Sequence, residues 1–158
     1  MGYNNVQFSD NIEKVIKNAS KIALRFGSQL VGTEHILYGI VCVPDCLASK
    51  LLRDNGVTEN ALFDLFEQSF TGISIFGNVE LTPRTKELFK QAQQLAMQFN
   101  HSFIGTEHLL LAILQNKSCY ATKILMSVFN VEVDMLRDQL LSNMEINSTP
   151  SQEGRESN

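Results

Sequence analysis

The 158-residue sequence has no apolar run close to the ~20 residues that a membrane-spanning helix requires. Residues 1–30 also lack a basic segment followed by an apolar block, so we predict no signal peptide. The net charge is −4 and the pI is about 5.3, whereas nucleic-acid-binding domains usually carry a basic stripe. These absences predict a cytoplasmic protein that binds neither membranes nor nucleic acid.

Cysteine is scarce, and its count is odd. The three cysteines are Cys42, Cys46 and Cys119, a pattern typical of reduced thiols in a cytosolic protein. Cys42 and Cys46 have the spacing of half a metal site, but no second cysteine pair or histidine cluster completes a zinc shell. We therefore interpret them as small residues near a turn between helices, and we predict no metal site.

The sequence also lacks the motifs that most often carry nucleotide binding or catalysis. It contains neither of the phosphate-binding glycine patterns, G-x-x-x-x-G-K-[ST] and G-x-G-x-x-G. The metalloprotease motif H-E-x-x-H and the nucleophile motif G-x-S-x-G are missing as well. We therefore predict no enzyme activity and no cofactor in this segment, with a small hydrolase as a minor alternative.

What the chain does contain is one tetrapeptide that occurs twice. Gly32-Thr33-Glu34-His35 recurs 73 residues later as Gly105-Thr106-Glu107-His108. The surroundings match at the same offset, since Phe8-Ser9 aligns with Leu81-Thr82. A period of this length indicates one repeat per folded unit.

The repeat accounts for nearly the whole chain. We predict a first unit at residues 6–70, a linker with two glycines at 71–78 and a second unit at 79–144. From Asn147 onward the chain is polar and offers no apolar face. We therefore predict that residues 145–158 are a disordered tail, or a linker toward a further module.

Apolar residues recur at spacings of three and four between hydroxyl and glycine residues, which is the pattern of amphipathic helices. Ser9 is expected to begin the first helix and Gly27 to end it, while Thr82-Pro83 begins the corresponding helix of the second unit. In the second unit we expect helices near 83–99, 106–115, 119–128 and 132–143. The prediction is an all-α fold of eight helices, arranged as two four-helix repeats related by a pseudo-twofold axis.

The duplicated glutamates, Glu34 and Glu107, are the strongest functional candidates. Each lies in the first turn of a predicted helix, where the helix dipole alone favours a carboxylate. Each repeat also has a helix start with a hydroxyl cap, at Ser9 and at Thr82, whose free backbone amides can hold an anion. A carboxylate beside such a start would bind a ligand that carries both a cation and an anion. The sequence leaves open whether the two features meet, and a purely structural role at the helix start is the alternative.

The histidines that follow these glutamates have a simpler interpretation. His35 and His108 adjoin apolar runs, where a histidine is more often a structural group than a base or a ligand. His101 is not repeated, because it aligns with Ser28. No serine or cysteine recurs with them in a pattern that would indicate a catalytic triad.

Several apolar residues lie outside the predicted helices: Phe8, Leu81, Ile73, Ile75 and Phe76. An exposed patch of such residues is typical of a protein-binding surface. The alternative, which we favour, is that they pack between the two repeats.

The two G-T-E-H-[IL]-L copies, each preceded by a hydroxyl-capped helix, and the Thr82-Pro83-Arg84 start resemble the N-terminal domain of Clp/Hsp100 unfoldases, especially the ClpC type. The resemblance covers residues 6–144 and includes the duplication. It implies a domain that receives substrate proteins and docks adaptor proteins of the MecA/McsB type. It also implies two AAA+ modules beyond this segment, which bind ATP and whose hexamer threads substrates into the ClpP peptidase.

In Gram-positive ClpC this domain also binds phosphoarginine, a degradation tag, in two pseudo-symmetric pockets. The resemblance implies that Glu34 and Glu107 are the pocket glutamates and that Ser9 and Thr82 supply the helix-start hydroxyls. We expect Glu34 to lie with Ser9 and Glu107 to lie with Thr82. Lys86 would add charge to the second pocket, whereas its counterpart in the first repeat is acidic.

The sequence departs from the family pattern in the loops. The segment after the second helix reads Val43-Pro44-Asp45-Cys46 in the first repeat and Asn116-Lys117-Ser118-Cys119 in the second. Because these loops border surfaces that adaptors use, the identity of the adaptor stays open. Two other functions also stay open: a docking module with degenerate pockets, and a stand-alone Clp-N accessory protein.

Overall fold

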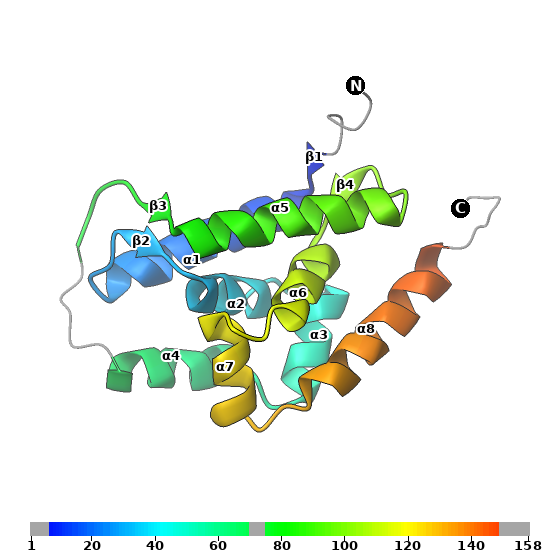
Figure 1. Ribbon diagram of the computed structural model, residues 1–158. Helices are drawn as coiled ribbons and strands as arrows, with labels where there is room; N and C mark the ends of the chain where they lie inside the picture. Colours follow the sequence, from blue (N-terminus) through cyan, green and yellow to red (C-terminus); the bar gives the residue numbers. More distant parts are fainter. Residues whose placement is uncertain (1–6, 70–74, 149–158) are drawn as a thin grey trace.

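The computed structural model describes residues 7–69 and 75–148, and within these ranges it contains eight α-helices and four short strands (Figure 1). The first repeat comprises β1 (Gln7–Phe8), α1 (Asp10–Arg25), β2 (Leu30–Val31), α2 (Thr33–Val41), α3 (Leu47–Asp54) and α4 (Glu59–Ser69). The second comprises β3 (Glu80–Leu81), α5 (Pro83–Gln98), β4 (Phe103–Ile104), α6 (Thr106–Gln115), α7 (Tyr120–Ser127) and α8 (Val133–Ser148). The predicted all-α fold is confirmed.

The last helix is longer than the sequence indicated. α8 runs to Ser148 instead of ending near residue 143, so it includes the first part of the predicted tail. The rest of that tail, residues 149–158, lies outside the described residues, as do positions 71–74 of the predicted linker. Among the described helices, none has both the length and the apolar character to cross a lipid bilayer.

The two repeats share a backbone conformation at their turns. Gly27 after α1 has φ 81°, and its counterpart after α5, Asn100, has φ 60°. Gly56 after α3 and Asn130 after α7 form a second such pair, with φ 83° and 55°. Glycine and asparagine tolerate this left-handed conformation best, and it ends a helix by turning the chain away from the axis. The same turn after each helix is therefore formed by glycine in the first repeat and by asparagine in the second.

The core is built around α2 and α6, which lie at the centre of the molecule between the long helices α1 and α5 and the shorter helices below them (Figure 1). Nearly every residue of both central helices is buried, as expected of helices that are apolar on all sides. α1 packs closely on α2, since a Cβ added at Gly39 would lie 2.5 Å from the carbonyl oxygen of Val15. The central helices thereby hold the glutamates at their N-terminal ends in fixed positions.

The four strands join one repeat to the other, a feature that the sequence did not predict. β1 pairs in parallel with β4, and β2 pairs in parallel with β3. Each pair therefore takes one strand from each repeat. Strands of two residues are too short to show a periodic pattern in the sequence.

The apolar residues outside the helices divide between the two predicted roles. Phe8 lies on β1 and packs edge-to-face on Phe89 of the other repeat, with ring centroids 5.7 Å apart. Leu81 on β3 also packs against the core. Phe76, in contrast, is 93% exposed, and Ile73 lies outside the described residues. Packing between the repeats therefore accounts for Phe8, whereas Phe76 remains on the surface.

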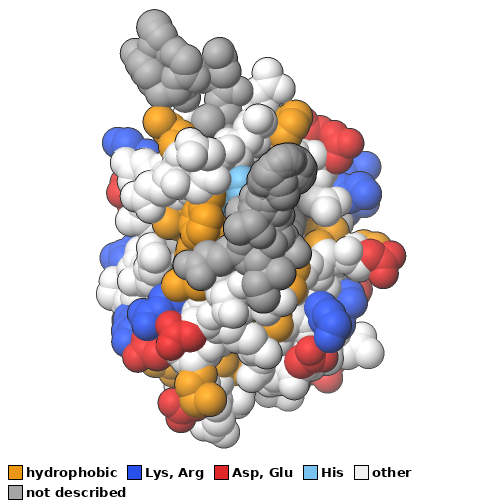
Figure 2. All heavy atoms as spheres, turned by 90° about the vertical axis from the view of Figure 1, so that its right-hand side faces the viewer, with side chains coloured by type: hydrophobic (Ala, Val, Ile, Leu, Met, Phe, Trp, Pro, Cys, Tyr) orange, Lys and Arg blue, Asp and Glu red, His pale blue; other side chains and the backbone are white. Residues whose placement is uncertain are grey.

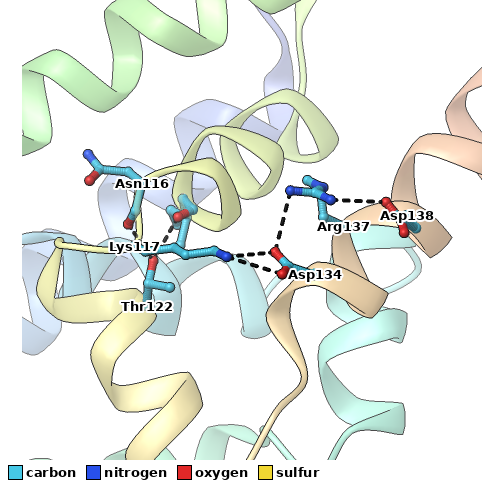
Figure 3. Close-up of polar contacts among 7 residues, drawn as sticks. Asn116, Lys117, Thr122, Asp134, Arg137 and Asp138 are labelled. Atoms are coloured by element: carbon cyan, nitrogen blue, oxygen red, sulfur yellow. Dashed lines mark hydrogen bonds and ion pairs between the residues drawn. The ribbon is translucent and has the colours of Figure 1, made fainter.

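The loop between α6 and α7 is tied to α8 by one exposed ion pair, beside which α8 carries two ion pairs of its own (Figure 3). Lys117 Nζ lies 2.9 Å from Asp134 Oδ1, and Arg137 bridges Asp134 and Asp138. The Thr122 hydroxyl of α7 donates to the carbonyl oxygen of Asn116 in this loop at 2.9 Å. This arrangement holds the start of α7, which contributes to the site described next.

Candidate functional site

The strand pairs bring helix starts from opposite repeats together. In the β1–β4 pair, Phe8 lies opposite Ile104, and the Ser9 N–H donates to the Ile104 carbonyl at 3.0 Å. In the β2–β3 pair, the Thr82 N–H donates to the Val31 carbonyl at 3.1 Å. Because the strands of each pair are parallel, the helices that follow them begin at the same end. α1 therefore begins beside α6, and α5 begins beside α2.

Each pair of helix starts borders a cavity that holds one glutamate. The α2/α5 pocket, of about 460 Å³, contains Glu34 and Thr82. The α1/α6 pocket, of about 630 Å³, contains Glu107 and Ser9. The prediction that Glu34 lies with Ser9 and Glu107 with Thr82 is therefore wrong. The physical reason is the strand pairing, which assembles each pocket from both repeats.

The two predicted hydroxyl caps are confirmed. Ser9 Oγ accepts a hydrogen bond from the Ile12 N–H at 3.2 Å, and Thr82 Oγ1 accepts one from the Thr85 N–H at 3.1 Å. Thr82 Oγ1 also lies 2.8 Å from the hydroxyl of Thr85, which is fully buried. Each cap satisfies one amide of the first turn, and α5 has one N–H fewer ahead of that amide than α1, because its first residue is a proline.

The histidines of the repeated tetrapeptide cap α2 and α6, which confirms their structural interpretation. His35 Nδ1 accepts from the Gly32 N–H at 2.9 Å, and His108 Nδ1 accepts from the Gly105 N–H at the same distance. Both rings are almost fully buried. Burial lowers the pKa of His35 to about 4 and also lowers the pKa of His108. Both side chains are therefore neutral acceptors at physiological pH.

The glutamate carboxylates fold back over the glycines that precede them. A Cβ added at Gly105 would lie 2.6 Å from Glu107 Oε1, and one added at Gly32 would collide with Glu34 Oε1. Glycine at these positions therefore leaves room for the carboxylate beside the helix start. Burial raises the pKa of Glu34, against the opposing effect of a hydrogen bond from its own backbone N–H.

The α2/α5 pocket carries positive charge in addition to Glu34. Its lining residues are Phe26, Ser28, Leu30, Gly32, Thr33, Glu34, His35, Thr82, Arg84, Ser118, Tyr120 and Lys123. Arg84 Nη1 donates to the Ser118 hydroxyl at 2.8 Å, which fixes one position of its guanidinium. Thr33 joins the two sides of the pocket, because its hydroxyl oxygen accepts from the Ala121 N–H of α7 at 3.0 Å. This pocket can offer a carboxylate to a cation and a basic helix start to an anion.

The α1/α6 pocket has a different polar lining. It is lined by Ser9, Asn11, Asp45, Cys46, Leu47, Asn100, His101, Ser102, Phe103, Gly105, Thr106, Glu107, His108 and Met144. His101 Nδ1 lies 2.8 Å from His108 Nε2. Since His108 Nδ1 accepts from the backbone, its Nε2 carries the proton and donates to His101. His101, which has no counterpart in the first repeat, thus continues the hydrogen bonding of the helix cap into the α1/α6 pocket.

Lys86 does not occupy the position that the sequence indicated. It is exposed on α5, whose start adjoins Glu34 and not Glu107. Among the described residues, the cations that line the α2/α5 pocket are Arg84 and Lys123. Lys86 is among the lining residues of neither pocket.

Sequence reasoning missed Arg84, Ser118 and Lys123 as pocket residues. Arg84 follows the helix-start signal Thr82-Pro83 directly, so its position was visible as a candidate. Ser118 and Lys123 come from the α7 region, and only the tertiary contact of α7 with α2 places them here. The sequence carries no local signal of that contact.

The cysteines are part of the helix turns. Cys46 is the N-cap of α3, where its sulfur accepts from the Ser49 N–H at 3.4 Å, and Cys119 is the buried N-cap residue of α7. Burial raises the pKa of Cys42 to about 11. Across residues 7–69 and 75–148, no group of three or more His, Cys, Asp or Glu side chains is placed to hold a metal ion.

Solved structures of Clp-type N-terminal domains have this fold. The N-terminal domain of the ClpD chaperone from Arabidopsis thaliana matches with a TM-score of 0.73 at 17% identity, over 87% of this chain and 97% of that one. The Hsp104 N-terminal domain from Candida albicans matches with a TM-score of 0.67 at 19% identity, over 87% and 91%. The architecture is thus that of a Clp/Hsp100 N-terminal domain.

Sequence comparison assigns the family. The family model of the Clp repeat (R) N-terminal domain matches residues 7–75 and 80–158, and the chain belongs to this family. The ClpC ATP-binding subunit of the ATP-dependent Clp protease from Staphylococcus aureus is 26% identical over 156 residues, or 96% of this chain. The chaperone protein ClpB from Oceanobacillus iheyensis is 30% identical over 151 residues, or 95%. The chain spans 19% and 18% of the lengths of these relatives.

Proposed function

We propose that this chain is the substrate- and adaptor-binding N-terminal domain of a ClpC-like ATP-dependent unfoldase, and that its α2/α5 pocket recognises phosphoarginine. The observation that carries the proposal is the placement of Glu34 and of the basic start of α5 in one cavity. Phosphoarginine combines a guanidino group with a phosphoryl group, so it needs both features at once. The domain itself binds and performs no catalysis.

The Glu34 carboxylate suits the guanidino end of this ligand. Carboxylate and guanidino groups form charge-assisted hydrogen bonds that are stronger than neutral ones. Burial already raises the pKa of Glu34, because removing a carboxylate from water makes it costly to ionise. A bound cationic group would favour the ionised form, and so ligand and carboxylate would stabilise each other.

The start of α5 suits the phosphoryl end. A helix N-terminus presents backbone N–H groups and a positive dipole end to an anion. The first turn of α5 contains no acidic residue, and Pro83 and Arg84 follow the Thr82 cap. Arg84, held by Ser118, and Lys123 from α7 add positive charge at the same cavity.

The family relatives support the wider assignment. Their names describe an ATP-binding subunit of an ATP-dependent Clp protease and a chaperone. A domain of this family would therefore deliver bound proteins to ATP-binding modules elsewhere in the parent protein, and from there to the ClpP peptidase. Adaptors of the MecA/McsB type and arginine-phosphorylated substrates are the partners that we propose for it.

Calorimetry with free phosphoarginine tests the tag-reading part of the proposal. We expect saturable binding that weakens by about tenfold or more in Glu34→Gln, because a charged hydrogen-bond partner is lost. Glu132→Gln, at an exposed glutamate outside both pockets, is the matched control and should bind as the unmodified chain does. Equal binding by all three proteins, or no heat at millimolar ligand, would remove the claim.

A protein-docking module with degenerate pockets is the alternative, and the exposed side chains of Leu30, Phe76 and Phe103 favour it. In that case Glu34 only stabilises the start of α2. Glu34→Gln would then lower the free energy of unfolding by roughly 0.3–1 kcal/mol and leave adaptor capture unchanged. Thermal unfolding measured beside calorimetry separates the two functions.

A further inference from the structure

The α1/α6 pocket repeats the architecture of the α2/α5 pocket with a different set of charges. Asn11 occupies the position of Arg84, 73 residues earlier, and Asp45 occupies that of Ser118. The α2/α5 pocket thus has a guanidinium that donates to a hydroxyl, where the α1/α6 pocket has an amide and a carboxylate. The exchange removes one positive charge and adds one negative charge at matching places.

The helix starts differ in the same direction. α1 has Asp10 and Glu13 in its first turn, whereas the first turn of α5 contains no acidic residue. Acidic side chains already compensate the dipole at the start of α1, and they repel a further anion there. The start of α1 is therefore a poor place for a phosphoryl group.

Lys123 lines the α2/α5 pocket, but no lysine lines the described part of the α1/α6 pocket. Lys50 aligns with Lys123, but its Nζ lies 3.1 Å from Asp54 in an ion pair on α3. Of the described residues that line the α1/α6 pocket, none is lysine or arginine, while Asp45 and Glu107 are both acidic. The charge of this pocket suits a cation without an attached anion.

An aromatic side chain completes the lining. Phe103 on β4 is 54% exposed and faces the same cavity, where the other repeat has Leu30. A guanidinium favours a site that offers both an aromatic face and a carboxylate. Figure 2, viewed from the side of β4 and α8, shows a histidine at the surface with hydrophobic side chains near it, while the visible Lys and Arg side chains lie toward the edges of this face.

We propose that the α1/α6 pocket binds an unphosphorylated arginine side chain of a bound polypeptide. The Glu107 carboxylate and Asp45 hold the guanidinium, and Phe103 covers its face. The two pockets would then recognise different side chains, a phosphorylated arginine at α2/α5 and an unmodified arginine at α1/α6. The inference rests on the proposed function only in treating both cavities as receptor sites for polypeptides.

Amide NMR titration of the 158-residue chain tests this proposal with N-acetyl-arginine amide as the probe. We expect saturable shifts at Ser102, Gly105 and Thr106, with smaller shifts at Gly32 and Thr33. The neutral isostere N-acetyl-citrulline amide should produce no such shifts. Shifts centred on Gly32 and Thr33, or equal shifts with the two probes, would overturn the proposal.

Matched glutamate variants assign the effect to one pocket. Glu107→Gln is expected to weaken binding of the arginine probe by about tenfold, while Glu34→Gln leaves it unchanged. If phosphoarginine fails to bind at α2/α5 but the arginine probe binds at α1/α6, then the proposed function fails and this inference stands. The reverse result sinks the inference alone.

A charge exchange gives a second test that does not depend on the glutamates. Asn11→Arg combined with Asp45→Asn places a cation at the start of α1, and asparagine tolerates the positive φ of 62° at position 45. We expect this double variant to lose the arginine probe and to gain phosphoarginine shifts at Gly105 and Thr106. Unchanged preference in a folded double variant would contradict the charge argument.

Discussion

In the α2/α5 pocket a ligand would meet Glu34 together with Arg84 and Lys123, whereas in the α1/α6 pocket it would meet Glu107 together with Asp45. The place of each pocket follows from strand pairing, which is the same on both sides. The charges come from side chains that differ between the repeats. A duplicated scaffold can therefore keep two binding positions while the chemistry of each changes separately.

The helix packing beneath the pockets differs as well. Gly39 of α2 allows close approach of α1, since an added Cβ would lie 2.5 Å from the Val15 carbonyl oxygen. In α6 the equivalent residue is Ala112, which is fully buried. The α1–α2 contact therefore depends on a missing side chain that the α5–α6 contact does not require.

Gly39→Ala should have the largest effect on stability. The new methyl group meets backbone that cannot move aside cheaply, so we expect a loss of about 3 kcal/mol in the free energy of unfolding. The matched reverse change, Ala112→Gly, removes only a methyl group and helix propensity and should cost about 1 kcal/mol. Urea denaturation of both variants measures the difference, and equal losses would show that the two helix pairs are packed alike.

His35 should make stability depend on pH. Burial lowers its pKa in the folded protein to about 4, from 6.5, so the unfolded chain binds more protons between these values. The contribution of neutral His35 to stability is therefore fully present above pH 6.5 and is lost as the pH falls toward 4. We expect the free energy of unfolding to fall by about 2 kcal/mol between pH 7 and pH 5. In His35→Asn an amide oxygen replaces Nδ1 as the cap acceptor without titrating.

Denaturation at the two pH values checks this account of the cap. The loss between pH 7 and pH 5 should be smaller in His35→Asn than in the unmodified chain. His108→Asn is the comparison in the other repeat, where the ring also donates a second hydrogen bond from Nε2 to His101. An identical pH dependence in the unmodified chain and in His35→Asn would show that His35 is not the titrating group.

Removing the two hydroxyl caps should lower the free energy of unfolding by different amounts. Ser9→Ala removes one cap and is expected to lower the free energy of unfolding by about 1 kcal/mol. Thr82→Ala also removes the partner of the buried Thr85 hydroxyl, so we expect about 1.5 kcal/mol. In the Thr82→Ala protein, the further change Thr85→Val removes the buried hydroxyl that has lost its partner. It should therefore recover part of the extra loss in the free energy of unfolding. If Thr85→Val recovers no stability, then the extra loss in Thr82→Ala does not come from the Thr85 hydroxyl.

The ion pair at the start of α7 should have the smallest effect. The hydrogen bond from Lys117 holds the pKa of Asp134 below its ordinary value, and the first repeat has Pro44 in place of this lysine. Lys117→Ala should raise the pKa of Asp134, as measured by carboxyl NMR, with little change in melting temperature. High salt should reduce the effect by screening exposed charges. A marked drop in melting temperature would mean that the loop depends on this pair.

Much of the fold could be predicted from the sequence because its signals are local. The repeated tetrapeptide, the hydroxyl caps at Ser9 and Thr82, and the apolar spacing of the helices each reside within a few adjacent residues. The pairing of helix starts in each pocket could not be predicted, because it depends on contacts between residues far apart in the sequence, such as Gln7 of β1 and Phe103 of β4. Lys123 was missed for the same reason, since its place in the α2/α5 pocket depends on how α7 packs on α2.

The assignment of phosphoarginine to the α2/α5 pocket can be tested with a crystal structure of the chain soaked with this ligand. We predict that the ligand lies in the α2/α5 pocket, with its guanidino group against Glu34 and its phosphoryl group at the start of α5 beside Thr82 and Arg84. A phosphoryl group bound at the start of α1 beside Ser9, or a ligand that leaves Glu34 uncontacted, would contradict it.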